Sequence, residues 1–197
     1  AEFRVATFER EASFREATFE HFVSFGEAIF GDETDFSGAT FKDRADFPKT
    51  KFKGDTFFTG IVFPSRPPSE LILMDRVRFE KPDSVHFDGT NLSCFLFLGT
   101  DIRKLDFLNV TWHSDGGHYI LSADLRLQRE VKLEEEVEKD IWRTRYSEQI
   151  SFSSDIVAQA YRDLRANYEL HRRYAEAGDF FTGEMDTLRL RPLHKGW

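Results

Sequence analysis

The chain has 197 residues, a net charge of −8, and 22 Phe against 5 Tyr and 3 Trp. This length is sufficient for one or two domains with a sizeable core. The acidic balance argues against a basic surface for nucleic acid. The single cysteine, Cys94, excludes an internal disulfide, and no apolar run reaches the roughly 20 residues that span a bilayer. Ala1 already stands in a repeat position, so we expect the chain to belong to a longer protein.

Phenylalanine recurs through residues 1–63 at intervals that alternate between five and six residues, and Ala or Thr stands two positions before most of these rings. An eleven-residue period can mark a right-handed coiled coil, but the Thr, Ser, Asp and Gly between the rings are mediocre helix formers. In an extended chain, residues two apart face the same side. The pattern therefore predicts a solenoid whose interior is a ladder of phenyl rings. We assign to this ladder Phe8, Phe14, Phe19, Phe25, Phe30, Phe36, Phe41, Phe47, Phe52, Phe97 and Phe107.

The array continues to Trp112 with two interruptions. Residues 64–70 contain three prolines, which cannot contribute to a strand ladder, and residues 80–84 form a second excursion. Between them we expect the inward pairs Leu71/Leu73 and Val77/Phe79. From Phe87 to Trp112 the inward positions are five residues apart.

These units resemble the pentapeptide repeat, A(D/N)LXX, in a Phe-rich form with an extra residue in alternate repeats. Ala6-Thr7-Phe8 and Ala39-Thr40-Phe41 carry the resemblance, and Asn91-Leu92 fits the family's D/N-L pair. The resemblance covers residues 1–112. It implies a right-handed quadrilateral β-helix with four repeats per coil, so the twenty inward positions correspond to about five coils. The expected fold is mainly β with an α tail.

Residues 113–152 are predicted to be a charged connector. Ser114-Asp115-Gly116-Gly117 is a turn signal. His113, Asp115 and His118 fit neither a helix face nor a strand face, so an exposed loop is favoured over a metal site. Leu133, Val137 and Ile141 recur at four-residue intervals and allow a helix with a thin apolar stripe.

Residues 153–197 are predicted to hold an antiparallel helical hairpin that ends at Pro192. Ser153, Ser154 and Asp155 are good N-cap types, and a break is expected near His171-Arg172-Arg173. The first apolar face comprises Val157, Ala160, Tyr161, Leu164 and Tyr168, and the second comprises Tyr174, Ala177, Phe181, Met185 and Leu188. We expect the hairpin to dock on the last coil near Phe107 and Trp112, with the first coil left bare.

The hairpin resembles a single tetratricopeptide-like unit. It is also similar to segments that follow pentapeptide arrays in some bacterial and archaeal proteins, several of which continue into membrane-spanning regions. A membrane-spanning continuation is therefore compatible with this chain, although the segment itself is not expected to insert into a membrane.

The sequence contains no Gly-rich phosphate loop, nucleophile elbow or His-Glu-x-x-His motif. Cys94 falls in an outward position without a basic neighbour to activate it. Glu184 is expected to pair with arginines of the hairpin. We therefore predict no catalytic residue, cofactor or metal ion.

Two functions remain open. The first is a non-enzymatic scaffold, cytoplasmic or on the cytosolic face of a membrane, that binds another protein. The exposed acids Glu16, Glu20, Glu27 and Asp32 are the candidate partner surface, and the alternative interpretation is a solvated face with alternating patches of charge. The second is a DNA mimic that binds a type II topoisomerase, as some pentapeptide proteins do. Mimicry requires a continuous negative face, which the basic residues between positions 42 and 53 interrupt, so the scaffold is favoured.

Overall fold

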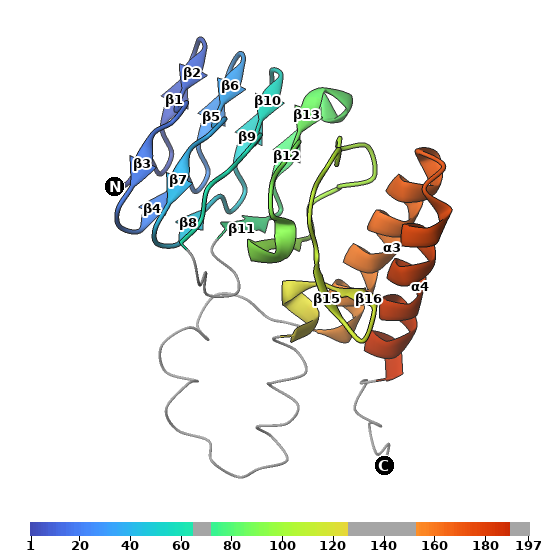
Figure 1. Cartoon of the computed structure of the whole chain (residues 1–197). Coiled ribbons are helices and arrows are strands. Elements are labelled where there is room, and N and C mark those ends of the chain that lie inside the picture. Colours follow the sequence, from blue (N-terminus) through green and yellow to red (C-terminus); the bar gives the residue numbers. More distant parts are fainter. Residues whose placement is uncertain (65–71, 126–152, 190–197) are drawn as a thin grey trace, which may run out of the picture.

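The computed structural model describes residues 1–64, 72–125 and 153–189. It shows a β-solenoid of about four turns of short parallel strands, followed by a pair of helices at its C-terminal end (Figure 1). The expected fold class is confirmed, with about four turns where about five coils were expected. The likeness to a pentapeptide repeat fits this solenoid and its many phenylalanines.

The strands stack into four parallel sheets around the coil. The first contains β1 (Thr7–Phe8), β5 (Ile29–Phe30), β9 (Lys51–Phe52) and β12 (Arg78–Phe79); the second contains β2 (Ala12–Ser13), β6 (Thr34–Asp35), β10 (Thr56–Phe57) and β13 (Val85–His86). The third contains β3 (Thr18–Phe19) and β7 (Thr40–Phe41); the fourth contains β4 (Val23–Ser24), β8 (Ala45–Asp46), β11 (Ile72–Asp75) and β14 (Phe95–Leu98). Isolated parallel bridges, Glu2–Ser24 and His86–Asp106, extend this arrangement at both ends.

The spacing of the phenylalanines sets the length of each coil. Thr7 pairs with Ile29, and Ile29 pairs with Lys51, so positions 7, 29 and 51 lie one coil of 22 residues apart. This is four intervals of alternately five and six residues. In the last coil, where every interval is five, His86 bridges to Asp106, 20 residues away.

The short intervals contain a tight turn. In the first five of them the carbonyl of a phenylalanine accepts a hydrogen bond from the N–H three residues later, as in Phe14 to Ala17 and Phe25 to Ala28. In the sixth, the Ile61 N–H donates to the Thr90 hydroxyl at 3.2 Å. The third residue of the turn has positive φ, as a type II turn requires. These residues recur every eleven positions through the first half of the solenoid: Val5, Glu16, Glu27, Gly38, Lys49 and Gly60.

The interior is a set of stacked phenyl rings. Phe8, Phe30, Phe52 and Phe79 form one stack with centroids 4.8, 4.9 and 5.3 Å apart. A second stack comprises Phe14, Phe36, Phe58 and Phe87, at 4.8, 5.1 and 5.2 Å. Rings of the second coil, and all rings of the third except Phe63, are fully buried, whereas those of the first coil are only partly buried.

Threonine can replace alanine in the small inward position because its hydroxyl finds a backbone carbonyl, either one coil earlier or, as in Thr56, two residues earlier. The Oγ1 atom of Thr50 donates to the carbonyl of Phe25 at 2.7 Å, and that of Thr100 donates to Met74 at 2.8 Å. Both threonines are buried. A buried hydroxyl needs such a partner, so this bond allows Thr to stand where other repeats have Ala.

The expected inward pair Leu71/Leu73 is wrong by one residue. Ile72 pairs with Ala45 and occupies the small position, and Met74 stands in the ladder beside Phe97. Leu73 instead pairs with Asp46 on the outward row. Residue 71 lies outside the described residues. Four consecutive apolar residues carry no period-two pattern, so the sequence contained no signal for this register.

The excursions and the connector are described only in part. Pro82–Ser84 and Leu92–Cys94 are short 3₁₀ helices. The proline-rich residues 65–70 and the possible helix at Leu133, Val137 and Ile141 lie outside the described residues. Residues 113–120 form an antiparallel hairpin, β15 (His113–Asp115) and β16 (His118–Ile120), which turns at Gly116 and Gly117.

The helical pair consists of α3 (Ser154–Leu170) and α4 (Tyr174–Arg189). The predicted N-cap is confirmed, because the Ser153 hydroxyl accepts a hydrogen bond from the Ile156 N–H at 3.3 Å. The break expected at residues 171–173 is also confirmed, as is the buried face of α3. The described part of the hairpin ends at residue 189.

The predicted apolar face of α4 is wrong except at Ala177. The helix buries Ala177, Phe180, Glu184 and Thr187, whereas Tyr174 and Phe181 are exposed. Phe180 packs edge-on against Trp112, with ring centroids 5.5 Å apart, and Tyr119 of β16 lies at the same distance. Because two phenylalanines are adjacent in α4, tertiary packing decided which one faces inward.

Candidate interaction surface

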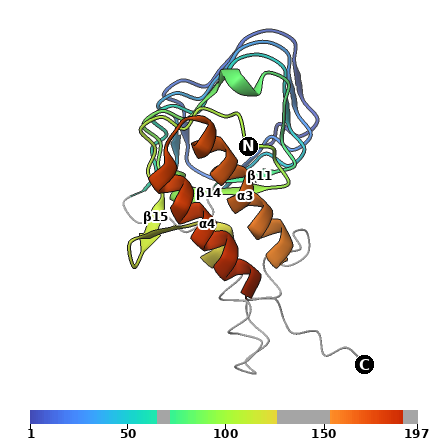
Figure 2. The ribbon, with the colours of Figure 1, turned by 90° about the vertical axis from the view of Figure 1, so that its right-hand side faces the viewer.

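The helical hairpin covers the last coil, as predicted. Seen from the hairpin end, α3 and α4 cross in front of the stacked coils (Figure 2). Trp112 donates its indole N–H to the Tyr168 hydroxyl at 2.8 Å, and the Phe107 and Trp112 rings lie 5.8 Å apart. The last layer of the ring ladder therefore continues directly into the aromatic residues of the hairpin.

Side chains of the hairpin also satisfy backbone carbonyls of the last coil. The buried Asn167 amide donates to the carbonyls of Ile102 and Leu105 at 3.0 and 2.8 Å. Arg173 donates to the carbonyl of Phe107 at 3.1 Å. In earlier coils, such carbonyls accept hydrogen bonds from backbone N–H groups of the next coil, as the Phe30 carbonyl does from Lys53. Here two side chains take that role. Asn167 was not predicted from the sequence, where its only signal is a polar residue beside the apolar face of α3.

Glu184 joins the two helices, as expected. Its carboxylate is almost completely buried and accepts hydrogen bonds from Arg162 at 2.9 Å and Arg165 at 3.0 Å. Arg165 also lies 5.4 Å from the centroid of the Phe181 ring. These contacts fix the orientation of α4 relative to α3 and make the hairpin a defined platform.

Tyr161 anchors α3 to the segment that follows β16. Its hydroxyl donates to Asp124 at 2.8 Å and accepts the N–H of Leu121 at 3.1 Å. Burial, followed by the neighbouring Asp124 carboxylate, raises the pKa of Tyr161 well above its usual value, so the hydroxyl keeps its proton. The ring lies so close to Gly183 of α4 that a Cβ atom there would be 2.3 Å from Tyr161 Cε1.

The described residues offer little for catalysis. Cys94 was expected in an outward position, but only 1% of it is exposed, and burial raises the pKa of its thiol. The 3₁₀ turn at Leu92–Cys94 draws it inward. His118 lies 3.2 Å from Asp179 of α4. No group of three possible metal ligands occurs within residues 1–64, 72–125 and 153–189.

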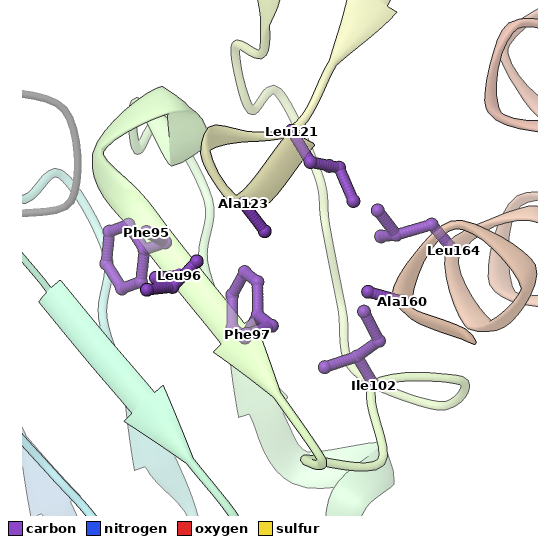
Figure 3. A pocket seen from close by; sticks show the side chains of 8 residues that line it. All are labelled: Phe95, Leu96, Phe97, Ile102, Leu121, Ala123, Ala160 and Leu164. Atoms are coloured by element: carbon purple, nitrogen blue, oxygen red, sulfur yellow. The ribbon is translucent and has the colours of Figure 1, made fainter. Parts of the chain in front are cut away.

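A small cavity lies between the last coil and α3 (Figure 3). Its volume is about 10 Å³, comparable to a single water probe. Phe97 and Ile102 face it from the coil, Leu121 and Ala123 from the following segment, and Leu164 from α3. Because every lining side chain is apolar, water would find no partner there, and the cavity is a packing defect of the docked hairpin.

The four candidate acids occupy four different bends. Glu16 lies between β2 and β3, Glu20 after β3, Glu27 between β4 and β5, and Asp32 between β5 and β6. All four are exposed. Their order around the coil distributes them over its perimeter and does not gather them on one face.

Acids and bases of adjacent coils form ion pairs. Lys42 lies 2.8 Å from Glu20, and Lys51 lies 2.6 Å from Glu80. Arg15 donates to Asp35 at 3.0 Å. The basic residues of positions 42–53 thus partly neutralise acids one coil away, and the negative charge is correspondingly discontinuous.

Exposed apolar residues form a stripe along α4. Tyr174 is 67% exposed and Phe181 is 46% exposed. Met185 and Leu188 are partly exposed, and a Cβ atom built on Gly178 would meet nothing within 4 Å. These positions follow one another at intervals of four and three residues, so they share one face of the helix. We call the set Tyr174, Gly178, Phe181, Met185 and Leu188 the α4 stripe.

Comparisons with protein-family models, curated proteins and solved structures found no match for this chain. Among the described residues, none of the helices has the length and apolar character needed to cross a membrane.

Proposed function

We propose that this protein is a non-enzymatic scaffold of the pentapeptide-repeat type, cytosolic in location, that binds protein through the outer face of its helical hairpin. The α4 stripe carries this proposal. Solvent-exposed apolar side chains in a row mark interaction sites more often than isolated ones do. The exposed residues Val5, Phe22 and Val62 of the β-helix, by contrast, lie on different coils or bends.

The architecture supports this role because it holds the stripe rigidly. Hydrogen bonds from arginines of α3 to Glu184 hold α4 against α3. Hydrogen bonds made by Asn167 and Trp112 hold α3 against the last coil of the ring ladder. A preorganised surface loses less entropy on binding than a mobile one. The ion pairs between coils count against the alternative, a DNA mimic, because mimicry depends on uncompensated acids in a continuous row.

Site-specific photocrosslinking in the producing cell tests the proposal. A photoreactive phenylalanine analogue at position 181 should give a light-dependent adduct with a protein. The matched control places the same analogue at Val62, which is 47% exposed on the β-helix. Equal or absent adduct formation at the two positions would refute binding through the hairpin.

A further inference from the structure

We propose that the α4 stripe binds the same stripe of a second copy of this chain, in an antiparallel, two-fold symmetric pair of helices. This inference rests on the proposed function and names the protein that occupies the surface. Three observations support it: the spacing of the stripe, its pattern of large and small residues, and the charges on the neighbouring edge of α3.

The spacing matches helix-on-helix packing. Positions 174, 178, 181, 185 and 188 alternate between intervals of four and three residues through four helical turns. This is the apolar seam that a second helix fills at a shallow crossing angle. A seam of this kind favours an α-helix over an extended peptide as its occupant.

The stripe is complementary to itself when reversed. Phe181 is its middle position, with Tyr174 seven residues before it and Leu188 seven residues after it. An antiparallel partner therefore brings Phe181 against the partner's equivalent ring and Tyr174 against Leu188. The same reversal places the long Met185 side chain opposite position 177, one residue from Gly178, where the structure leaves open space. Large residues thus meet a small one, as knobs-into-holes packing requires.

The edge of α3 beside the stripe is charge-complementary in the same arrangement. Arg162 and Glu169 lie on this edge, on either side of Arg165, which lies over Phe181. Both Arg162 and Glu169 retain solvent exposure, at 43% and 53% of their side chains. Reversal about Phe181 brings Arg162 of one copy toward Glu169 of the other. A parallel pair would instead place like charges together.

The seam is short, so the association should be weak. One helix pair buries less surface than a standard stable interface, and we expect a dissociation constant of the order of micromolar. Sedimentation equilibrium of the 197-residue chain should therefore show a monomer–dimer equilibrium. Phe181→Gln should raise the dissociation constant at least about tenfold, whereas Val62→Thr on the β-helix should leave it unchanged.

A cysteine variant tests the geometry. Phe181→Cys should form a symmetric disulfide-linked dimer under mild oxidation because the two-fold axis passes beside position 181. Val62→Cys should remain monomeric, and the native Cys94 is buried and does not compete. Circular dichroism identifies any variant that fails to fold.

The outcomes separate the two proposals. A wild-type chain that stays monomeric at 100 times the expected constant, or a Phe181→Gln variant that dimerises normally, would overturn self-association. If photocrosslinking at position 181 then captures a different protein, the scaffold proposal stands and only its occupant changes. If position 181 gives neither a dimer nor a specific adduct, both proposals fail.

Discussion

The interior of the β-helix and the interface between its last coil and the hairpin bury similar residues in different ways. Inside the coil, each phenylalanine stacks on an equivalent ring one coil away, as Phe30 does on Phe8 and Phe52 at 4.8 and 4.9 Å. The hydrogen bonds at the interface do not follow the repeat. Trp112 donates a hydrogen bond to Tyr168, and Asn167 donates to two backbone carbonyls of the last coil.

This difference separates two kinds of stability. In a solenoid the free energy is approximately a sum over similar units and their neighbours, so burial of rings sets the scale. At the cap, backbone groups that a further coil would satisfy depend on individual side-chain donors. An unpaired carbonyl there has no neighbouring layer to replace the bond. Ring deletion and donor deletion therefore test the two regions separately.

The largest effect is expected in the ring ladder. Phe30→Ala should lower the free energy of unfolding by about 3–5 kcal/mol because it removes a buried ring and leaves a cavity between two others. Thr18→Ala, at an exposed position of β3, should change stability by less than about 0.5 kcal/mol. Denaturant unfolding measures both. Similar losses for the two variants would refute the ladder as the main source of stability.

The cap should be more sensitive to donor chemistry than to size. Asn167→Asp keeps the shape of the side chain but replaces the N–H donors with an acceptor that faces two carbonyls. We expect a loss of about 3 kcal/mol, against about 1–3 kcal/mol for Asn167→Ala. The surface variant Gln159→Ala is the control. If the two variants at position 167 lose the same free energy of unfolding, the amide hydrogen bonds contribute nothing specific, and the cap depends on burial as the ladder does.

The sequence predicted the repeating region well because its signal is redundant. The intervals between phenylalanines specified the 22-residue coil, and the change to five-residue intervals specified the 20-residue coil at His86 and Asp106. Each unit repeats the same spacing of phenylalanines, so an irregular residue in one unit does not change the predicted coil. The register failed at Ile72 and Met74, where apolar residues fill both faces of the strand, and the 3₁₀ turn at Leu92–Cys94 reversed the expected orientation of Cys94.

The candidate surface was harder to predict because its signals occur once. The choice between Phe180 and Phe181 depends on where Trp112 and Tyr119 lie, which local periodicity does not encode. Apart from Ala177, the predicted apolar face of α4 consequently lies on the exposed side. Asn167 looked like a tolerated polar residue until the carbonyls of Ile102 and Leu105 were placed beside it.

A smaller effect is expected where the two helices touch. Gly183→Ala should destabilise the protein by about 1–3 kcal/mol because the added methyl group meets the Tyr161 ring at 2.3 Å. Gly178→Ala, in the same helix but facing open space, should stabilise it by up to about 1 kcal/mol through helix propensity. Thermal unfolding of dilute protein compares them. Equal shifts in the same direction would show that helix propensity, and not the fit against Tyr161, decides the outcome.

The smallest effect concerns the turns of the ladder itself. Glu16 adopts φ of 55°, while Gly38 and Gly60 occupy the equivalent position in the next two coils. A left-handed conformation costs a non-glycine residue roughly 1–2 kcal/mol. Introducing glycine offsets part of this gain, because its greater freedom in the unfolded chain lowers the free energy of unfolding by about 0.5–1 kcal/mol. Glu16→Gly should therefore stabilise the protein by about 0.5 kcal/mol in denaturant unfolding. Glu20→Gly, outside the turn, should destabilise it slightly. If both variants lose stability equally, the positive φ carries no strain, and the repeating turns do not limit the stability of the coil.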